Sequence, residues 1–155
     1  YNRSVEKDPR VAYPFGYGMS YTTFEYSNIK AEKSVVTNAE KISISVDVKN
    51  TGNFAGDEVV ELYLSPADGN KNIRPIQLQG FARVTLNPNE TKTVSFTMSP
   101  SQFGYYSDNH WVIDPGKYTI KVGASSQDIR QFEEIEMTGD QKILDLRTKY
   151  FAEVK

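Results

Sequence analysis

Alternation between apolar and polar residues recurs along most of the chain and predicts β-strands. The clearest stretch is KISISVDVKN, residues 41–50, in which four apolar residues alternate with polar ones: Ile42, Ile44, Val46 and Val48. Successive side chains of a strand point to opposite faces, so this segment would present one apolar face to a core. We expect further strands at residues 20–26, 58–65, 78–86, 92–98, 117–125 and 128–137.

Turn-forming residues lie between the expected strands. The sequence NTGNFAGDE follows the strand at 41–50, and Pro115 with Gly116 suits a type II turn, in which proline fixes one dihedral and glycine adopts a positive one. Short strands separated by turns at intervals of about ten residues are typical of an antiparallel β-sandwich. The predicted fold class is therefore all-β, with an immunoglobulin or fibronectin type III-like sandwich. In its last strand, three residues are expected to reach the core: Ile129, Phe132 and Ile135.

Three segments fall outside the alternating pattern. Residues 1–12 are polar, contain a proline and follow no period, which is typical of a linker or a surface loop. Residues 99–116 form a long, aromatic-rich connection, with a short strand expected near Trp111. Near the end of the chain, four residues have helical spacing and indicate a short helix: Ile143, Leu146, Tyr150 and Val154. These segments are additions to a sandwich that needs only about 100 residues.

The composition limits the classes of function. The chain has 155 residues, with 18 basic and 20 acidic side chains, a net charge of −2 and no dense run of lysine or arginine. We therefore expect no nucleic acid and no membrane surface as a partner. No apolar run reaches the roughly 18 residues that span a bilayer, and no signal-peptide pattern is found. The absence of cysteine excludes disulfides, thiolate nucleophiles and cysteine-ligated metals.

The ionisable residues do not form a catalytic arrangement in the sequence. Glycoside hydrolysis uses two carboxylates that face each other across the sugar, about 5 to 10 Å apart. The adjacent pairs Asp57–Glu58 and Glu133–Glu134 do not meet this requirement, because neighbours on a strand point to opposite faces. His110 is the only histidine, and a single histidine cannot form the common zinc sites. We therefore expect no catalytic residue, no metal site and no cofactor.

Aromatic residues gather in two places, each with more than one interpretation. YPFGYGMSYTTFEY, residues 13–26, could hold sugar-stacking rings, begin the hydrophobic core or form an adhesive strip that docks onto another surface. The second group comprises Tyr105, Tyr106, His110 and Trp111. Because a flat ring fits the apolar face of a pyranose, this group is a candidate carbohydrate contact. The alternative is that these rings pack at the end of the sandwich or at an interface.

Four segments, taken together and in order, resemble one known domain. They are YPFGYGMSYTTFEYS at 13–27, VDVKNTGNFAGDEVVELYLS at 46–65, RPIQLQGFARVTLNPNETKTVSFTM at 74–98 and WVIDPGKYTIKVGASSQDIR at 111–130. This set resembles the fibronectin type III-like domain that accompanies the catalytic domains of glycoside hydrolase family 3, the β-glucosidase and β-xylosidase family. The resemblance extends over roughly residues 13–132, with Tyr13 and Met19 standing where the family more often has phenylalanine and leucine.

The resemblance carries implications for organisation and partners. In such enzymes a segment like FGYGMSYT is the crossing from an α/β domain into the fibronectin-like domain, so Tyr13, Phe15 and Tyr17 are expected to bury against a neighbouring domain. The implied partners are the catalytic TIM barrel and the α/β domain of a parent enzyme, which hold the family's catalytic residues. The expected organisation is a linker with a docking strip at 1–19, a sandwich at 20–136 and a C-terminal extension at 137–155.

Three functions agree with these observations. The first is a non-catalytic accessory domain that stabilises catalytic domains, aids dimerisation or shapes outer substrate subsites. The second is a carbohydrate-binding module that contacts an oligosaccharide through Trp111 and its neighbours. The third is a free-standing protein-interaction domain. Coplanar, exposed rings around Trp111 would favour the second function, and buried rings would exclude it.

Overall fold

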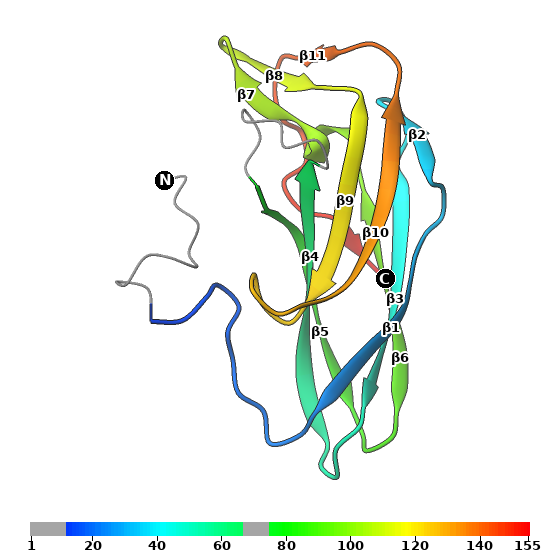
Figure 1. Cartoon of the computed structure of the whole chain (residues 1–155), viewed down its shortest axis with the longest axis vertical. Helices are drawn as coiled ribbons and strands as arrows, with labels where there is room; N and C mark the ends of the chain where they lie inside the picture. The colour runs from blue at the N-terminus through cyan, green and yellow to red at the C-terminus, as the bar shows by residue number, and fades with distance from the viewer. Residues whose placement is uncertain (1–11, 67–74) are drawn as a thin grey trace.

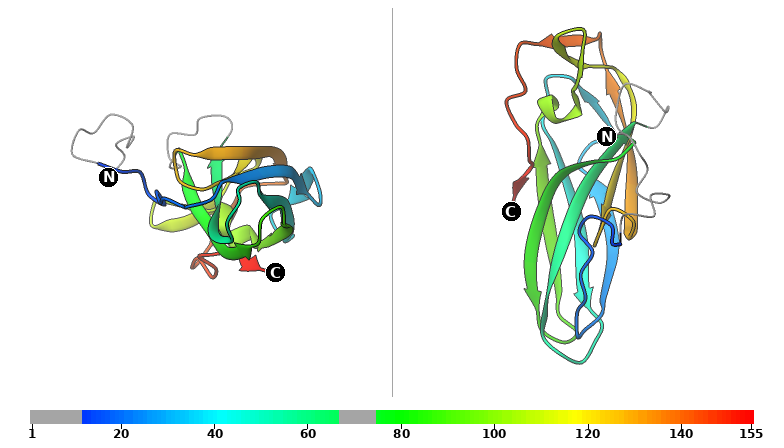
Figure 2. Two further views of the ribbon diagram at one scale, coloured as in Figure 1. Left: turned by 90° about the horizontal axis from the view of Figure 1, so that it is seen from below. Right: turned by 90° about the vertical axis from the view of Figure 1, so that its left-hand side faces the viewer.

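A computed structural model describes residues 12–66 and 75–155, and its long β-sandwich is shown in Figures 1 and 2. One sheet has the order β1 (Phe24–Ala31), β3 (Ile42–Asn50), β6 (Thr91–Met98) and β12 (Glu153–Val154). The facing sheet has the order β2 (Val35–Thr37), β10 (Ile129–Thr138), β9 (Gly116–Gly123), β4 (Gly56–Pro66) and β5 (Gln77–Leu86). All neighbouring strands of the sandwich are antiparallel except β2 and β10, which run parallel. The predicted fold class is confirmed.

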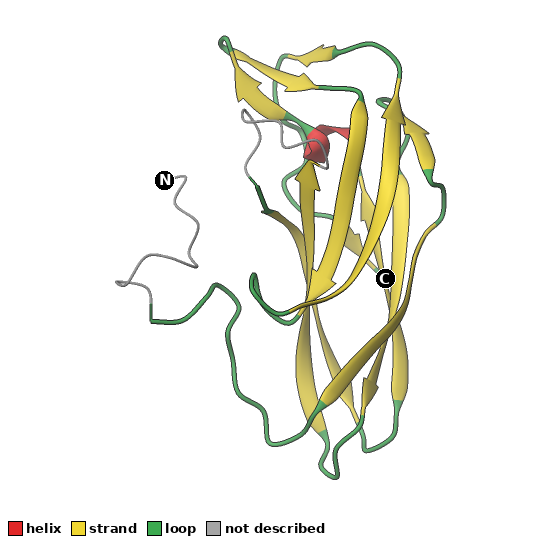
Figure 3. Cartoon of the chain, in the orientation of Figure 1, coloured by secondary structure: helices red, strands yellow, loops and turns green. Residues whose placement is uncertain are grey.

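A small third sheet lies at the upper end of the sandwich in Figure 1. It has the order β11 (Lys142–Leu144), β8 (His110–Ile113) and β7 (Tyr105–Ser107). A short 3₁₀ helix, Pro100–Phe103, precedes it and is the one red element in Figure 3. The expected short strand near Trp111 is therefore present as β8, and it belongs to a hairpin with β7.

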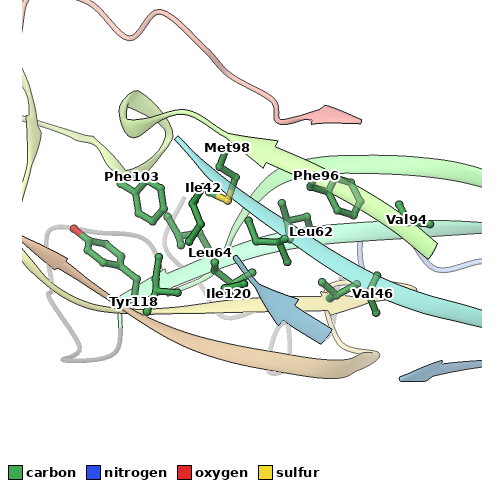
Figure 4. Packing of buried hydrophobic residues seen from close by; sticks show 14 of the residues in the cluster. Ile42, Val46, Leu62, Leu64, Val94, Phe96, Met98, Phe103, Tyr118 and Ile120 are labelled. Carbon is green, nitrogen blue, oxygen red and sulfur yellow. The ribbon is translucent and has the colours of Figure 1, made fainter. Parts of the chain in front are cut away.

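The core lies between the two large sheets. Ile42, Ile44, Val46 and Val48 of β3 are all buried, as their alternation predicts. Figure 4 shows side chains of β3 and β6 meeting those of β4 and β9, among them Phe96, Leu62 and Ile120. Glu61 and Tyr63 lie on the outer face of β4, and both are also buried.

The first strand begins later in the chain than its sequence predicts and continues to Ala31. Strand pairing begins at Phe24, opposite Asn50, and Asn50 is the last residue of β3, so residues 20–23 have no partner strand. Tyr26 is buried, but Tyr21 is 99% exposed. The prediction of a strand from residue 20 is wrong because alternation alone does not reveal where the partner strand ends.

Phe132 does not reach the core, in contrast to Ile135. On β10 the buried side chains are Ile135 and Met137, which share one face. Phe132 is an odd number of residues from both and points to the opposite face, where it is 65% exposed. The prediction for Phe132 is wrong because its spacing fits the opposite register.

The predicted C-terminal helix is wrong as well. The chain after β10 instead pairs with strands already in place, through β11 on β8 and β12 on β6. The Ala152 amide donates to the Gln79 carbonyl at 2.6 Å, and Lys155 and Ser95 exchange two backbone hydrogen bonds. These bonds satisfy the backbone without a helix, and the four residues with helical spacing are all exposed.

Candidate docking site at the N-terminal aromatic segment

Tyr13, Phe15 and Tyr17 form an exposed cluster that we call the aromatic strip. Their exposed fractions are 65%, 62% and 52%. The Tyr17 amide donates to the Pro14 carbonyl at 3.2 Å, and this turn stacks the rings of Tyr13 and Tyr17 with centroids 4.8 Å apart. The structure thus stacks two of the three residues that the resemblance singled out, and leaves the third, Phe15, exposed beside them in the sequence. In Figure 1 this segment descends beside the sandwich before β1 begins.

Two contacts attach the strip to the five-stranded sheet. The Ser126 amide donates to the Phe15 carbonyl at 2.9 Å. Gly16 has a φ of +82°, and a β-carbon placed on it would lie 2.4 Å from a carboxylate oxygen of Glu61. Gly16 therefore lies directly on the outer face of β4. Its positive φ favours glycine, and a β-carbon at this position would displace the carboxylate of Glu61.

Replacing Gly16 by alanine is expected to destabilise the chain by about 1–3 kcal/mol, because a non-glycine residue at positive φ is strained and its β-carbon would collide with Glu61. Chemical denaturation measures the effect. Gly18→Ala is the matched control, since a β-carbon at Gly18 meets nothing within 4 Å. An equal loss of stability in the two variants would contradict the contact between Gly16 and Glu61.

Glu61 is a buried carboxylate beneath the strip. It is 4% exposed and accepts a hydrogen bond from the Tyr63 hydroxyl. Burial raises the pKa of Glu61 above its ordinary value, because desolvation disfavours the charged form, while the bond from Tyr63 partly opposes this shift. Folding therefore favours the protonated carboxyl at this position.

The raised pKa of Glu61 predicts a pH dependence of stability. As the pH rises from the ordinary glutamate pKa to the raised value, the folded chain keeps a proton that the unfolded chain has lost, so the free energy of unfolding falls. Glu61→Gln keeps an acceptor for Tyr63 and removes the titration, so the variant should lose less stability over this interval. Urea denaturation at several pH values measures the slope. Equal slopes for the variant and the wild type would contradict the prediction.

A pocket of about 330 Å³ adjoins the strip. Tyr17 and Phe24 contribute aromatic rings to its lining, and Glu58, Asp128 and Arg130 contribute charges. The Arg130 guanidinium bonds Asp128 at 2.7 Å and the Phe24 carbonyl at 2.7 Å, and lies 4.9 Å from the centre of the Tyr26 ring. These groups come from four separate segments, so sequence patterns did not identify the pocket.

Asp57 and Glu58 point to opposite faces of β4, as expected for neighbours. Asp57 accepts hydrogen bonds from Arg83 and Thr85, which hold its pKa below the ordinary value. Glu58 accepts one from the Tyr26 hydroxyl at 2.9 Å. The two carboxylates therefore do not face each other as an acid–base pair would. Within residues 12–66 and 75–155, no group of three or more acidic or histidine side chains is placed to hold a metal ion.

The second aromatic group does not form one flat surface. Tyr105 is buried and its hydroxyl donates to Asp114 at 2.7 Å, whereas Tyr106 is 61% exposed. The rings of Tyr106 and Trp111 are 5.8 Å apart and inclined by 67°. His110, at the start of β8, is exposed.

Arg147 of the C-terminal extension occupies one side of this group. Its guanidinium carbon lies 5.6 Å from the centre of the Trp111 ring and 5.2 Å from that of Tyr150. Arg147 also donates to the buried Gln79 side chain at 3.1 Å. Burial lowers the pKa of Arg147 from its ordinary value. No signal in the sequence indicated Arg147, because it reaches Trp111 only through the pairing of β11 with β8.

No helix among the described residues has the length and apolar character to span a bilayer.

Comparison with known proteins relates the chain to a fibronectin type III-like domain and to β-glucosidases and β-xylosidases. The family model of the fibronectin type III-like domain matches residues 58–126. The chain is 41% identical over 133 residues to thermostable beta-glucosidase B of Acetivibrio thermocellus, covering 84% of this chain and 18% of the relative. It is 40% identical over 121 residues to a beta-xylosidase of Formosa agariphila, covering 77% of this chain and 17% of the relative.

Solved structures show the same relation. Beta-glucosidase 3B from Thermotoga neapolitana in complex with alpha-D-glucose superposes with a TM-score of 0.77 at 31% identity, covering 86% of this chain and 18% of that one. The Kluyveromyces marxianus beta-glucosidase in complex with glucose gives a TM-score of 0.76 at 40% identity, covering 87% and 16%. The chain thus spans less than a fifth of the length of these relatives.

Proposed function

Because this chain contains the fibronectin type III-like domain that occurs in β-glucosidases and β-xylosidases of glycoside hydrolase family 3, we propose that it is a non-catalytic accessory domain of such a hydrolase. Its role is to stabilise the catalytic TIM barrel and α/β domain, through the aromatic strip. The same proposal includes two further roles, the shaping of outer substrate subsites and the formation of dimer contacts, since both require a domain held firmly against the catalytic domains.

The exposure of the aromatic strip is the observation that carries the proposal. Three aromatic side chains are more than half exposed within five residues. Exposed apolar clusters are rare on soluble monomers and mark surfaces that bind another protein surface. The strip is also attached to the sheet by Gly16 and Ser126, so it presents its rings in a fixed position.

The proposal is tested first by sequencing the DNA that flanks the coding segment. We expect an open reading frame that continues into a TIM barrel and an α/β domain. In the polypeptide encoded by that frame, replacing Tyr13, Phe15 and Tyr17 together by serine should lower the midpoint of thermal unfolding of the catalytic domains. Phe132→Ser is the control, because Phe132 is equally exposed but lies on β10, outside the strip.

Three results would contradict the proposal. A short, isolated gene would leave no catalytic domain for the strip to stabilise. In a longer polypeptide, an unchanged midpoint after loss of all three strip rings would show that the strip has no such role. Hydrolysis of aryl glucosides by the chain alone would contradict its non-catalytic character.

Carbohydrate binding is the second candidate function, because the ring of Tyr106 is exposed and lies beside Trp111. Trp111 is the only tryptophan, so its fluorescence reports directly on this site. We expect no saturable change on titration with gluco- or xylo-oligosaccharides, because the two rings are inclined and Arg147 covers part of Trp111. A saturable change that Tyr106→Ala and Arg147→Ala both alter would favour carbohydrate binding instead.

A further inference from the structure

The pocket beside the strip contains more negative than positive charge. Two carboxylates, Glu58 and Asp128, face one guanidinium, that of Arg130. Arg130 directs its hydrogen bonds to Asp128 and to the Phe24 carbonyl, and its nearest approach to Glu58 is 3.8 Å. Asp128 is thus hydrogen-bonded to Arg130, while Glu58 forms only a longer ion pair with Arg130, without a hydrogen bond.

Glu58 has few hydrogen-bond and charge partners for a carboxylate with so little exposure. Its side chain is 12% exposed. One oxygen, Oε1, accepts a bond from the Tyr26 hydroxyl, and among the described residues no hydrogen bond is made to the other oxygen. Burial raises the pKa of Glu58, with the bond from Tyr26 and the charge of Arg130 opposing that shift. A cationic donor in the pocket would add a hydrogen bond to this second oxygen and a positive charge closer than that of Arg130.

The pocket and the aromatic strip form one continuous surface. Tyr17 belongs to both, and its ring is stacked on Tyr13. A surface that covers the strip would therefore also cover the mouth of the pocket. Tyr13 covers one face of the Tyr17 ring, so a sugar could stack only on its other face. A side chain carried by the covering surface fits the pocket better.

We propose that the domain covering the aromatic strip inserts a lysine or arginine side chain into this pocket, where it pairs with Glu58. The inference rests on the proposed function, since it requires a docked domain. The size of the pocket, about 330 Å³, accommodates one long side chain. Most of the length of the related hydrolases lies outside this chain and can supply that side chain. The aromatic strip provides apolar contact area, and the ion pair with Glu58 fixes the orientation of the two domains.

The test uses Glu58→Gln, which removes the charge but keeps an acceptor for the Tyr26 hydroxyl. In this chain alone the substitution should leave the midpoint of thermal unfolding unchanged or raise it, because it removes an incompletely paired buried charge. In the complete polypeptide it should lower the midpoint by about 2 °C or more, because the inserted cation loses its partner. Glu134→Gln, on the exposed face of β10, should have the same small effect in both.

The outcomes separate this inference from the proposed function. An effect of Glu58→Gln with the same sign in both proteins would overturn the inserted cation. If replacing Tyr13, Phe15 and Tyr17 by serine still lowers the midpoint of the complete polypeptide, the docked domain is supported without the ion pair. If neither this variant nor Glu58→Gln changes that midpoint, the docked domain is contradicted as well. A rise in the midpoint of the isolated chain on adding glucose or xylose, abolished by Glu58→Gln, would overturn the inference by making the pocket a sugar site.

Discussion

Replacing Phe96 by alanine is expected to lower the free energy of unfolding of this chain by about 3–5 kcal/mol. Phe96 lies on β6 with an exposed fraction of 0%, opposite Ile44 of β3. It is among the largest fully buried side chains and contacts the facing sheet near Leu62 (Figure 4). Loss of the ring removes buried apolar area and leaves a cavity that the two sheets cannot close, because both are held by continuous strand pairing.

Phe132→Ala is the matched control for Phe96→Ala. The residue type and the substitution are the same, and Phe132 also lies on a strand of the sandwich, but its side chain is 65% exposed. Phe132 buries little apolar area on folding, so truncating it should change the free energy of unfolding by no more than about 0.5 kcal/mol. Urea denaturation of the two variants measures the difference. Comparable losses would show that the core does not lie where the buried alternation places it.

The same pair of residues shows what the sequence could predict. Phe96 lies in a strand whose alternating apolar residues all share one face, and its burial follows from a period of two. The apolar residues of β10 do not all share one period. Ile129 and Ile135 fit one register and Phe132 fits the other, so local pattern alone could not place Phe132. Its orientation is fixed by pairing with β9, a partner that the pattern in β10 does not reveal.

The candidate docking site was predictable to a similar extent. The resemblance singled out Tyr13, Phe15 and Tyr17, and the structure exposes all three. Their attachment depends on contacts from distant segments, such as the Ser126 amide on the Phe15 carbonyl. A backbone contact of this kind imposes no repeating pattern on the sequence. The pocket charges were missed for the same reason, since Glu58 and Arg130 meet only after β4 and β10 join one sheet.

Asn50 is expected to give the second large effect, with Asn50→Ala costing about 3 kcal/mol or more. This side chain is fully buried at the end of β3 and uses both ends of its amide. Its oxygen accepts from the Thr22 hydroxyl at 2.7 Å and from the Gly52 amide at 3.0 Å. Its nitrogen donates to the carbonyls of Phe54 at 2.8 Å and Leu86 at 3.0 Å. Each buried group left unpaired costs about 1–3 kcal/mol.

The loss of Asn50 should also be felt in the segment that carries the aromatic strip. The bond from Thr22 joins residues just after the strip to the end of the sandwich, so Asn50→Ala should increase amide hydrogen exchange around residues 22–24. Asn53→Ala is the control, because Asn53 lies in the same turn and is exposed. If Asn50→Ala lowered stability without changing exchange at residues 22–24, Asn50 would support the turn alone. If both effects occur, one buried amide couples the stability of the sandwich to the position of its docking surface.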